Sequence, residues 1–151
     1  MPAEELVERS TTIVLARVVK AELSDETGEV IYTFSTMRAL KGKPAASFTL
    51  TGDAMMWEGE LQDFDFHQDA KFWEDNSGRM HHDTDCLIHP TFTVGTSYLI
   101  FPDAPYHRKS FELIIRTHGE KDVRDKWLSW VEETIKKQNK AEMATPRKPS
   151  D

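Results

Sequence analysis

Short runs of β-branched and aromatic residues, separated by turn-forming residues, constrain the fold of this chain more than any other feature of its sequence. Residues 13–20 read IVLARVVK, an apolar run too short and too branched to favour a helix. In residues 30–38 aromatic side chains alternate with threonine and serine, which is the period-2 pattern of a half-buried strand. The turn that ends at Gly28 lies between these runs and predicts a hairpin. Three further strands are predicted at residues 47–51, 91–101 (bent at Gly95) and 111–116.

Helical patterns flank these strands at both ends. Pro2, followed by glutamates at positions 4 and 5, suits the first turn of a short helix. A longer amphipathic helix of about four turns is predicted from Asp122 onward. Its apolar stripe, at helical spacing, consists of Trp127, Trp130, Val131, Thr134 and Ile135. We expect Trp127, Val131 and Ile135 to face the strands beside Leu6 and Val7. Residues 139–151 are polar with two prolines and are predicted to be disordered.

Five strands between two helices favour a small closed or partly open β-barrel over a sandwich, because the strand count is low and a glycine bend occurs. The expected fold is therefore mainly β: a five-stranded OB-like barrel with a short N-terminal helix and a longer C-terminal one. The chain of 151 residues suggests one domain, over residues 1–138. Its 10% aromatic content excludes a disordered chain, and no apolar run is long enough for a membrane span.

The charge of the chain is concentrated in one segment. Residues 53–85 hold ten acidic residues against two basic ones, a local charge of −8 in a chain of net charge −7. Such a segment disfavours nucleic acid as a ligand and favours cations or basic partners. The alternative is a solvated acidic loop that only increases solubility.

This acidic segment belongs to a long insert, residues 53–90, between the third and fourth predicted strands. It exceeds the ~12–15 residues at which a structureless loop becomes unusual, so it needs structure or function of its own. Residues 69–78 predict one or two helical turns, with Asp69 as N-cap and Gly78 past the C-terminal end. Phe72 and Trp73 either anchor the insert on the barrel or, if exposed, form a binding hot spot. The candidate binding surface comprises Phe64, Phe66, Phe72, Trp73 and Arg79.

Imidazole, carboxylate and thiolate groups, the ligands of zinc and copper, are dense in the same insert. The candidate metal ligands are His67, His81, His82, Asp85, Cys86 and His89. The pair Cys86-x-x-His89 resembles one half of a structural zinc site, whose other half would come from His67 or His81. The spacing matches no standard motif, and the alternative is a set of surface histidines in an acidic loop.

Enzymatic activity is not expected. Nucleophile-elbow, Walker-type, H-E-x-x-H and dinucleotide-binding motifs are all absent from the sequence. Cys86 beside a histidine would act as a nucleophile only with an oriented base and an oxyanion site. As the single cysteine, it also excludes a disulfide within the chain.

Three motifs in this order carry a resemblance to a known family. Residues 5–10, ELVERS, lead into the first strand; Tyr32-Thr33-Phe34 is followed by Leu40-Lys41-Gly42; and Cys86 precedes FTVGTSYLIF at residues 92–101. This order resembles the netrin-like and metalloproteinase-inhibitor (TIMP) type of OB-fold, particularly its secreted bacterial members. The resemblance covers residues 4 to about 135, except most of the acidic insert. It implies a barrel with the two terminal helices packed together, export from the cytoplasm and binding to other proteins.

The sequence departs from this family in its cysteines. Metalloproteinase inhibitors of this type coordinate the protease zinc through an amino-terminal cysteine, and no cysteine precedes Cys86 here, so that mechanism cannot be assigned. The resemblance also implies that an upstream cysteine pairs with a later one. Cys86 then indicates either a chain trimmed after a signal peptide and a lost cysteine, or a cytoplasmic relative. Extracellular or periplasmic location is the expectation, with cytoplasmic location as the alternative.

These inferences give two hypotheses of different classes. The first is a non-catalytic, exported, netrin-like module that binds an unknown protein partner through its acidic aromatic insert, as a monomer. The alternative is a zinc- or copper-binding protein that uses the histidine, aspartate and cysteine cluster.

Overall fold

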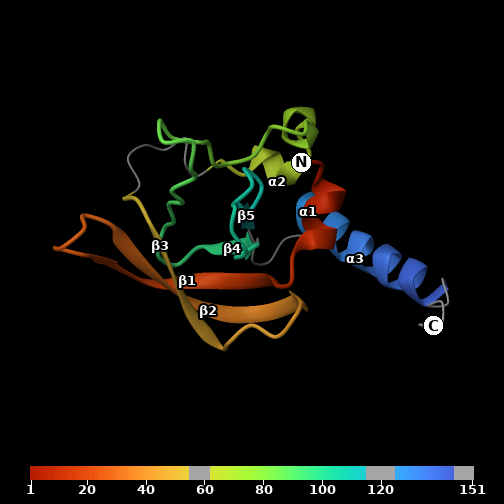
Figure 1. Cartoon of the computed structure of the whole chain (residues 1–151), viewed down its shortest axis with the longest axis horizontal. Coiled ribbons are helices and arrows are strands. Elements are labelled where there is room, and N and C mark those ends of the chain that lie inside the picture. The colour runs from red at the N-terminus through yellow and green to blue at the C-terminus, as the bar shows by residue number, and fades with distance from the viewer. Residues whose placement is uncertain (55–61, 115–124, 145–151) are drawn as a thin grey trace, which may run out of the picture.

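The computed structural model describes residues 1–54, 62–114 and 125–144, and its centre is a five-stranded antiparallel sheet in the order β3-β2-β1-β4-β5 (Figure 1). The strands are β1 (Ile13–Leu23), β2 (Val30–Lys41), β3 (Ser47–Gly52), β4 (Ser97–Ile100) and β5 (Phe111–Ile114). The mainly β fold is confirmed. Because β3 and β5 lie at opposite edges and do not pair, the sheet is not closed into the expected barrel.

The helices lie outside the sheet. They are α1 (Ala3–Arg9), α2 (Phe64–His67), the 3-10 turn η2 (Ala70–Trp73) and α3 (Lys126–Ala144). Helix α3 packs beside α1, and the Gln138 side chain donates a hydrogen bond to the Glu4 carbonyl oxygen at 3.0 Å. No helix in the described part of the chain is long and apolar enough to cross a membrane.

The long strand β1 joins the two halves of the sheet. Its β-branched residues favour an extended backbone, and it pairs with β2 over most of its length and with β4 near its start. The predicted hairpin between β1 and β2 is confirmed, with Val18 opposite Phe34. The register shifts between Val18 and Lys20, where an extra residue forms a β-bulge.

Alternating side chains of β1 pack into two apolar clusters on opposite faces of the sheet. Val14 and Val18 join the first cluster, to which Met80 and Ile88 of the insert and Phe92, just after it, also belong. Ile13 and Leu15 join the second, which α1 and α3 cover. The second cluster also contains Leu6, Val7, Trp127 and Val131, with Ile135 at its margin, as the helical stripe predicted.

Several predicted boundaries are wrong. Residues 91–94 form no strand, because the chain turns at Gly95, whose φ of +91° suits glycine. The strand that pairs with β1 is residues 97–100, and Gly95 and Thr96 add hydrogen bonds to Val18 of β1. The C-terminal helix continues to Ala144, through the start of the tail that was expected to be disordered. Residues 115–116, 122–124 and 145–151, included in the predicted strand, helix and tail, lie outside the described residues.

Candidate functional site

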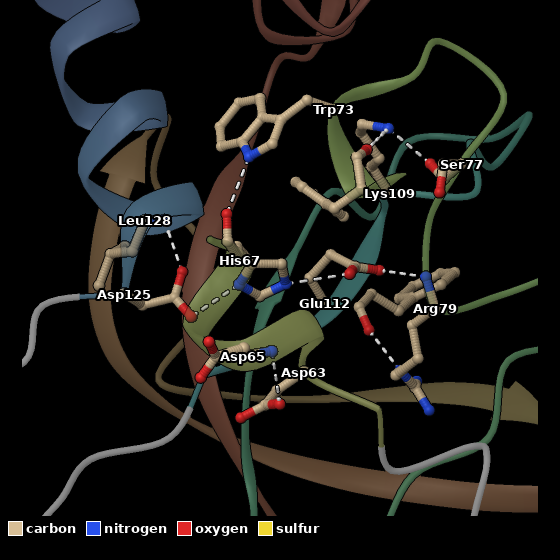
Figure 2. A network of polar contacts seen from close by, with 12 residues as sticks. Asp63, Asp65, His67, Trp73, Ser77, Arg79, Lys109, Glu112, Asp125 and Leu128 are labelled. Atoms are coloured by element: carbon tan, nitrogen blue, oxygen red, sulfur yellow. Dashed lines mark hydrogen bonds and ion pairs between the residues drawn. The ribbon is translucent and has the colours of Figure 1, made fainter. Parts of the chain in front are cut away.

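The first half of the insert, residues 62–80, is joined to the sheet by buried charged side chains (Figure 2). At their centre lies His67, whose side chain is fully buried. Its Nδ1 lies 2.7 Å from Asp125 Oδ2 and its Nε2 lies 3.0 Å from Glu112 Oε1. The imidazole therefore connects the insert to β5 and to the start of α3. We call His67, Arg79, Glu112 and Asp125 the buried polar network.

Both carboxylates favour the protonated imidazole. Burial alone lowers the pKa of His67, but the hydrogen bonds to Asp125 and Glu112, with their negative charges, outweigh it and raise the pKa to about 9. His67 is then an imidazolium at neutral pH and donates from both ring nitrogens. The buried charges are thereby paired, as stable burial of ions requires.

The backbone that carries His67 is unusual. All four residues of α2 have positive φ, between 54° and 62°, which makes it a left-handed helical turn. For residues with side chains this conformation costs roughly 1–2 kcal/mol each. The Asp63 side chain caps the turn at the Asp65 amide, and Trp73 Nε1 donates to the His67 carbonyl oxygen at 2.8 Å. The turn is thus held by contacts on both sides and by the ion pairs of His67.

Arg79 secures the end of this first half along the edge of β5. Its backbone amide donates to Glu112 Oε2 at 2.7 Å, and its Nε donates to the Phe111 carbonyl oxygen at 2.8 Å. The guanidinium also lies 5.0 Å from the ring centre of Tyr98. The backbone at position 78 passes so close to Arg108 that only glycine fits, since a Cβ there would lie 2.1 Å from the Arg108 carbonyl oxygen.

Lys109 organises the loop between α2 and Arg79. Its ammonium donates to the carbonyl oxygens of Phe72, Glu74 and Ser77 at 2.6 to 2.8 Å. It also lies 4.5 Å from the centre of the Phe72 ring. Burial lowers the pKa of Lys109, and nearby carboxylates, first Glu112, oppose that shift. One ammonium group therefore holds three backbone carbonyl groups of the loop together.

The aromatic residues of the predicted binding surface serve mainly as anchors. Phe72 is fully buried and Arg79 is buried, whereas Phe64, Phe66 and Trp73 are half-buried. Phe72 and Trp73 both contact Trp127 of α3, with ring centres 5.2 and 5.9 Å apart. Of the two readings of these aromatics, anchoring is the one that the structure supports. The predicted helical turn is present as a 3-10 turn, with Asp69 capping the Lys71 amide, but it ends at Trp73 instead of continuing towards Gly78.

The candidate metal ligands do not converge. His67 lies in the buried polar network, while His81, His82 and Cys86 are exposed. His89 and Asp85 form an ion pair of 2.6 Å at the surface. This contact with Asp85 raises the pKa of His89, and hydrogen bonds from the Leu87 amide and His89 lower that of Asp85. Among the described residues, no three side chains of the metal-binding types are placed to hold an ion.

Charge in the insert is segregated by depth. Of its basic and imidazole groups, Arg79 and His67 point inward while Lys71, His81 and His82 are exposed, and Lys109 of the neighbouring loop is buried below it. Its carboxylates point to solvent. The acidic surface of the insert, as we define it, comprises Asp65, Asp69, Glu74, Asp75, Asp83 and Asp85, all exposed. A negative surface therefore covers a layer of buried cations.

A cavity of about 460 Å³ lies elsewhere, beside α1, and Arg9, Asp75, Asp103 and Arg108 are among its lining residues. None of the residues of the buried polar network lines it. The network is therefore not the floor of this cavity.

Sequence reasoning did not find Glu112, Asp125 or Lys109. A signal for Glu112 was available, because it interrupts the otherwise apolar run Phe111–Ile114, and an acid within such a run needs a buried partner. Asp125 caps α3 through the Leu128 amide at 3.0 Å, so it is an N-cap three residues after the expected start. Neither a protein-family model nor a curated protein sequence matches this chain.

Proposed function

We propose that this chain is a non-catalytic, exported protein-binding module of the netrin-like type, and that it binds a basic partner through the acidic surface of its insert. The observation that carries the proposal is the segregation of charge in the insert. Six carboxylates are exposed, with Lys71 exposed among them and Asp85 paired with His89, whereas His67, Arg79 and Lys109 are buried beneath. Such a surface attracts basic proteins over a distance and increases their association rate.

The arrangement of elements supports the family part of the proposal. In the strand order β3-β2-β1-β4-β5, the edge strands β3 and β5 are the two that would pair to close a five-stranded barrel. Helices α1 and α3 pack together, as the resemblance to netrin-like domains implies. Fold likeness alone does not define a partner, so the surface has to carry the functional argument.

The insert also has the rigidity that a binding surface needs. Within residues 62–80, the backbone is held by the buried polar network and by the three hydrogen bonds from Lys109. A surface that is already ordered loses little conformational entropy when a partner binds. Binding through exposed carboxylates should also weaken as salt increases, since salt screens charges over about 8–10 Å.

The test compares two variants of equal net charge. The first, Asp65→Asn/Glu74→Gln/Asp75→Asn, neutralises part of the acidic surface at side chains that make no hydrogen bond among the described contacts. The control, Asp25→Asn/Glu26→Gln/Glu29→Gln, removes the same charge from the exposed turn between β1 and β2. The probes are peptides of one length whose net charge varies from acidic to basic.

We expect the wild-type protein and the control to bind basic peptides in a salt-dependent manner, and the first variant to bind them at least tenfold more weakly. Equal binding by the two variants would show that only the overall charge matters and would refute the proposed surface. The export part is tested by non-reducing mass spectrometry of the protein from the exported fraction. There we expect the exposed Cys86 to be disulfide-bonded to a cysteine that this sequence does not contain, and a Cys86 that stays free although such a cysteine is available would argue against the netrin-like assignment.

A further inference from the structure

The cavity beside α1 has walls from three separate parts of the chain. Helix α1 supplies Leu6 and Arg9, the loop after η2 supplies Asp75, and the loop between β4 and β5 supplies Asp103 and Arg108. The volume of about 460 Å³ lies within the range of about 300–1,000 Å³ that is usual for small-molecule sites. Apolar and charged side chains both line the cavity, so it suits a ligand that has an apolar part and charged groups.

Four of the lining residues are arginines or aspartates, and two of these already have partners. Arg9 forms an ion pair of 2.9 Å with Glu5 of the same helix. Asp103 Oδ2 accepts hydrogen bonds from the Thr11 amide at 2.6 Å and from the Thr11 hydroxyl at 2.8 Å. Recognition of a charged ligand therefore falls to the other two charged groups.

The first of these groups is the half-buried guanidinium of Arg108. Its Nη1 donates to the Asn76 carbonyl oxygen at 2.9 Å, and its Nε donates to His82 Nδ1 at 3.3 Å. In the described part of the chain, no carboxylate forms an ion pair with this guanidinium. The two hydrogen bonds fix its orientation, but partial burial of a cation without a counter-ion is unfavourable. An anion in the cavity would supply the missing charge.

The second group is the exposed carboxylate of Asp75. Within the described residues it accepts no hydrogen bond and forms no ion pair, and it acts on the buried Lys109 ammonium only over a distance. The backbone around it is fixed, because the carbonyl oxygens of residues 74, 76 and 77 accept hydrogen bonds from Lys109 or Arg108. One wall of the cavity thus presents an anion that has no bound cation.

We propose that this cavity binds a small zwitterion, namely an amino acid or a dipeptide with an apolar side chain. Its carboxylate pairs with Arg108, whose planar guanidinium suits a carboxylate, and its ammonium group pairs with Asp75. Arg108 holds the carbonyl oxygen of the residue next to Asp75, so a short molecule can reach both charges. The apolar side chain of the ligand packs against Leu6 and Tyr106, which also line the cavity.

This site goes beyond the proposed binding of a basic protein and does not depend on it. The two sites share only Asp75, because the other five residues of the acidic surface do not line the cavity. Binding of a basic peptide and binding of a zwitterion can therefore fail separately. A change at Arg108 affects the second site and leaves the carboxylates of the first in place.

The first test varies the ligand and uses the wild-type protein. Leucine carries both charges, leucinamide only the ammonium group and N-acetylleucine only the carboxylate, while leucylleucine holds the two charges further apart. In calorimetric titrations we expect leucine or leucylleucine to bind at least about tenfold more tightly than both singly charged analogues, because each analogue lacks one charge-assisted contact. The tighter of the two zwitterions distinguishes an amino acid site from a dipeptide site. Heat of dilution for all four compounds, or equal affinities, would overturn the proposal.

The second test assigns each charge of the ligand to its residue. Arg108→Met should abolish the preference for the zwitterion over leucinamide, and Asp75→Asn should abolish the preference over N-acetylleucine. The controls Arg38→Met and Glu74→Gln remove the same charges outside the cavity lining and should bind like the wild type. Circular dichroism checks the fold, and Arg108→Lys, which keeps the charge, replaces Arg108→Met if that variant does not fold. Preferences that persist in both the Arg108 and Asp75 variants would refute the assigned contacts.

Discussion

The two halves of the insert contain the same kinds of residue, but these residues are buried in one half and exposed in the other. In the first half, residues 62–80, His67 and Arg79 are buried and bonded to other elements. In the second half, residues 81–90, the histidines at positions 81 and 82 and Cys86 are exposed. The difference arises outside the insert, because β5 and α3 supply Glu112 and Asp125 to the first half only. A charged residue is buried where another element brings its partner.

The two halves also contain two different kinds of ion pair, one buried and one exposed. His67 with its two carboxylates is shielded from water, whereas His89 and Asp85 pair at the surface within one short segment. Exposed pairs of this kind contribute about 0–1 kcal/mol, while removal of one member of a buried pair typically costs 3–5 kcal/mol. Substitutions in the two halves should therefore differ severalfold in effect.

The largest effect is expected for His67→Ala. This change removes the cation that hydrogen-bonds to both buried carboxylates, so the free energy of unfolding should fall by about 3–5 kcal/mol at neutral pH. Urea denaturation measures the loss, and His89→Ala is the matched control, with an expected change below about 1 kcal/mol. Equal losses in the two variants would contradict the distinction between the halves.

The wild-type protein should lose stability in mildly alkaline solution. The pKa of His67 is raised from 6.5 to about 9 in the folded chain, so the folded state binds its proton more tightly than the unfolded state. The stabilisation is complete below pH 6.5 and is lost as the pH rises through about 9, amounting to about 3 kcal/mol. Denaturation series between these limits should show this decline, and the decline should be absent in His67→Ala.

A smaller loss, about 1–3 kcal/mol, is expected for Lys109→Met. Methionine has a similar length, but it removes the ammonium donor from the carbonyl oxygens of Phe72, Glu74 and Ser77, of which Glu74 keeps the Ser77 amide as a donor. Hydrogen exchange should accelerate in residues 70–78 before it does in β1. Unchanged exchange there would show that the loop does not depend on the ammonium.

The smallest effect is expected in the second half. His81→Ala/His82→Ala/Cys86→Ser alters three exposed side chains, so the free energy of unfolding should change by no more than about 0.5 kcal/mol. Because the candidate ligands do not converge, calorimetric titration of the wild type with zinc or copper should give only heat of dilution. Submicromolar binding that this triple variant abolishes would restore the metal-binding hypothesis.

The strands and the long helix could be predicted from sequence because their signals are local. Alternation in residues 30–38 and the stripe through Trp127 and Val131 describe which side chains face the core, and the structure places them there. The strand predicted at residues 91–94 is wrong, because turn formation at Gly95 outweighs the strand preference of its neighbours. Local preference also cannot show whether strands at the two edges of a sheet meet.

The buried polar network could not be predicted in the same way, because its contacts are distant in sequence. His67 lies 45 residues from Glu112 and 58 from Asp125, and no periodicity links such positions. Nor does any local pattern predict four consecutive residues with positive φ, since α2 takes this conformation through contacts with other parts of the chain.

Lys109 has a consequence for the order in which the chain can assemble during synthesis. The carbonyl oxygens that it gathers belong to residues 32 to 37 positions earlier in the chain. When Phe72 is added to the growing chain, the donor that will fix its loop has not yet been made. Because domains fold as their residues become available, the first half of the insert reaches its final shape only after the β5 region has emerged, later than the hairpin of β1 and β2.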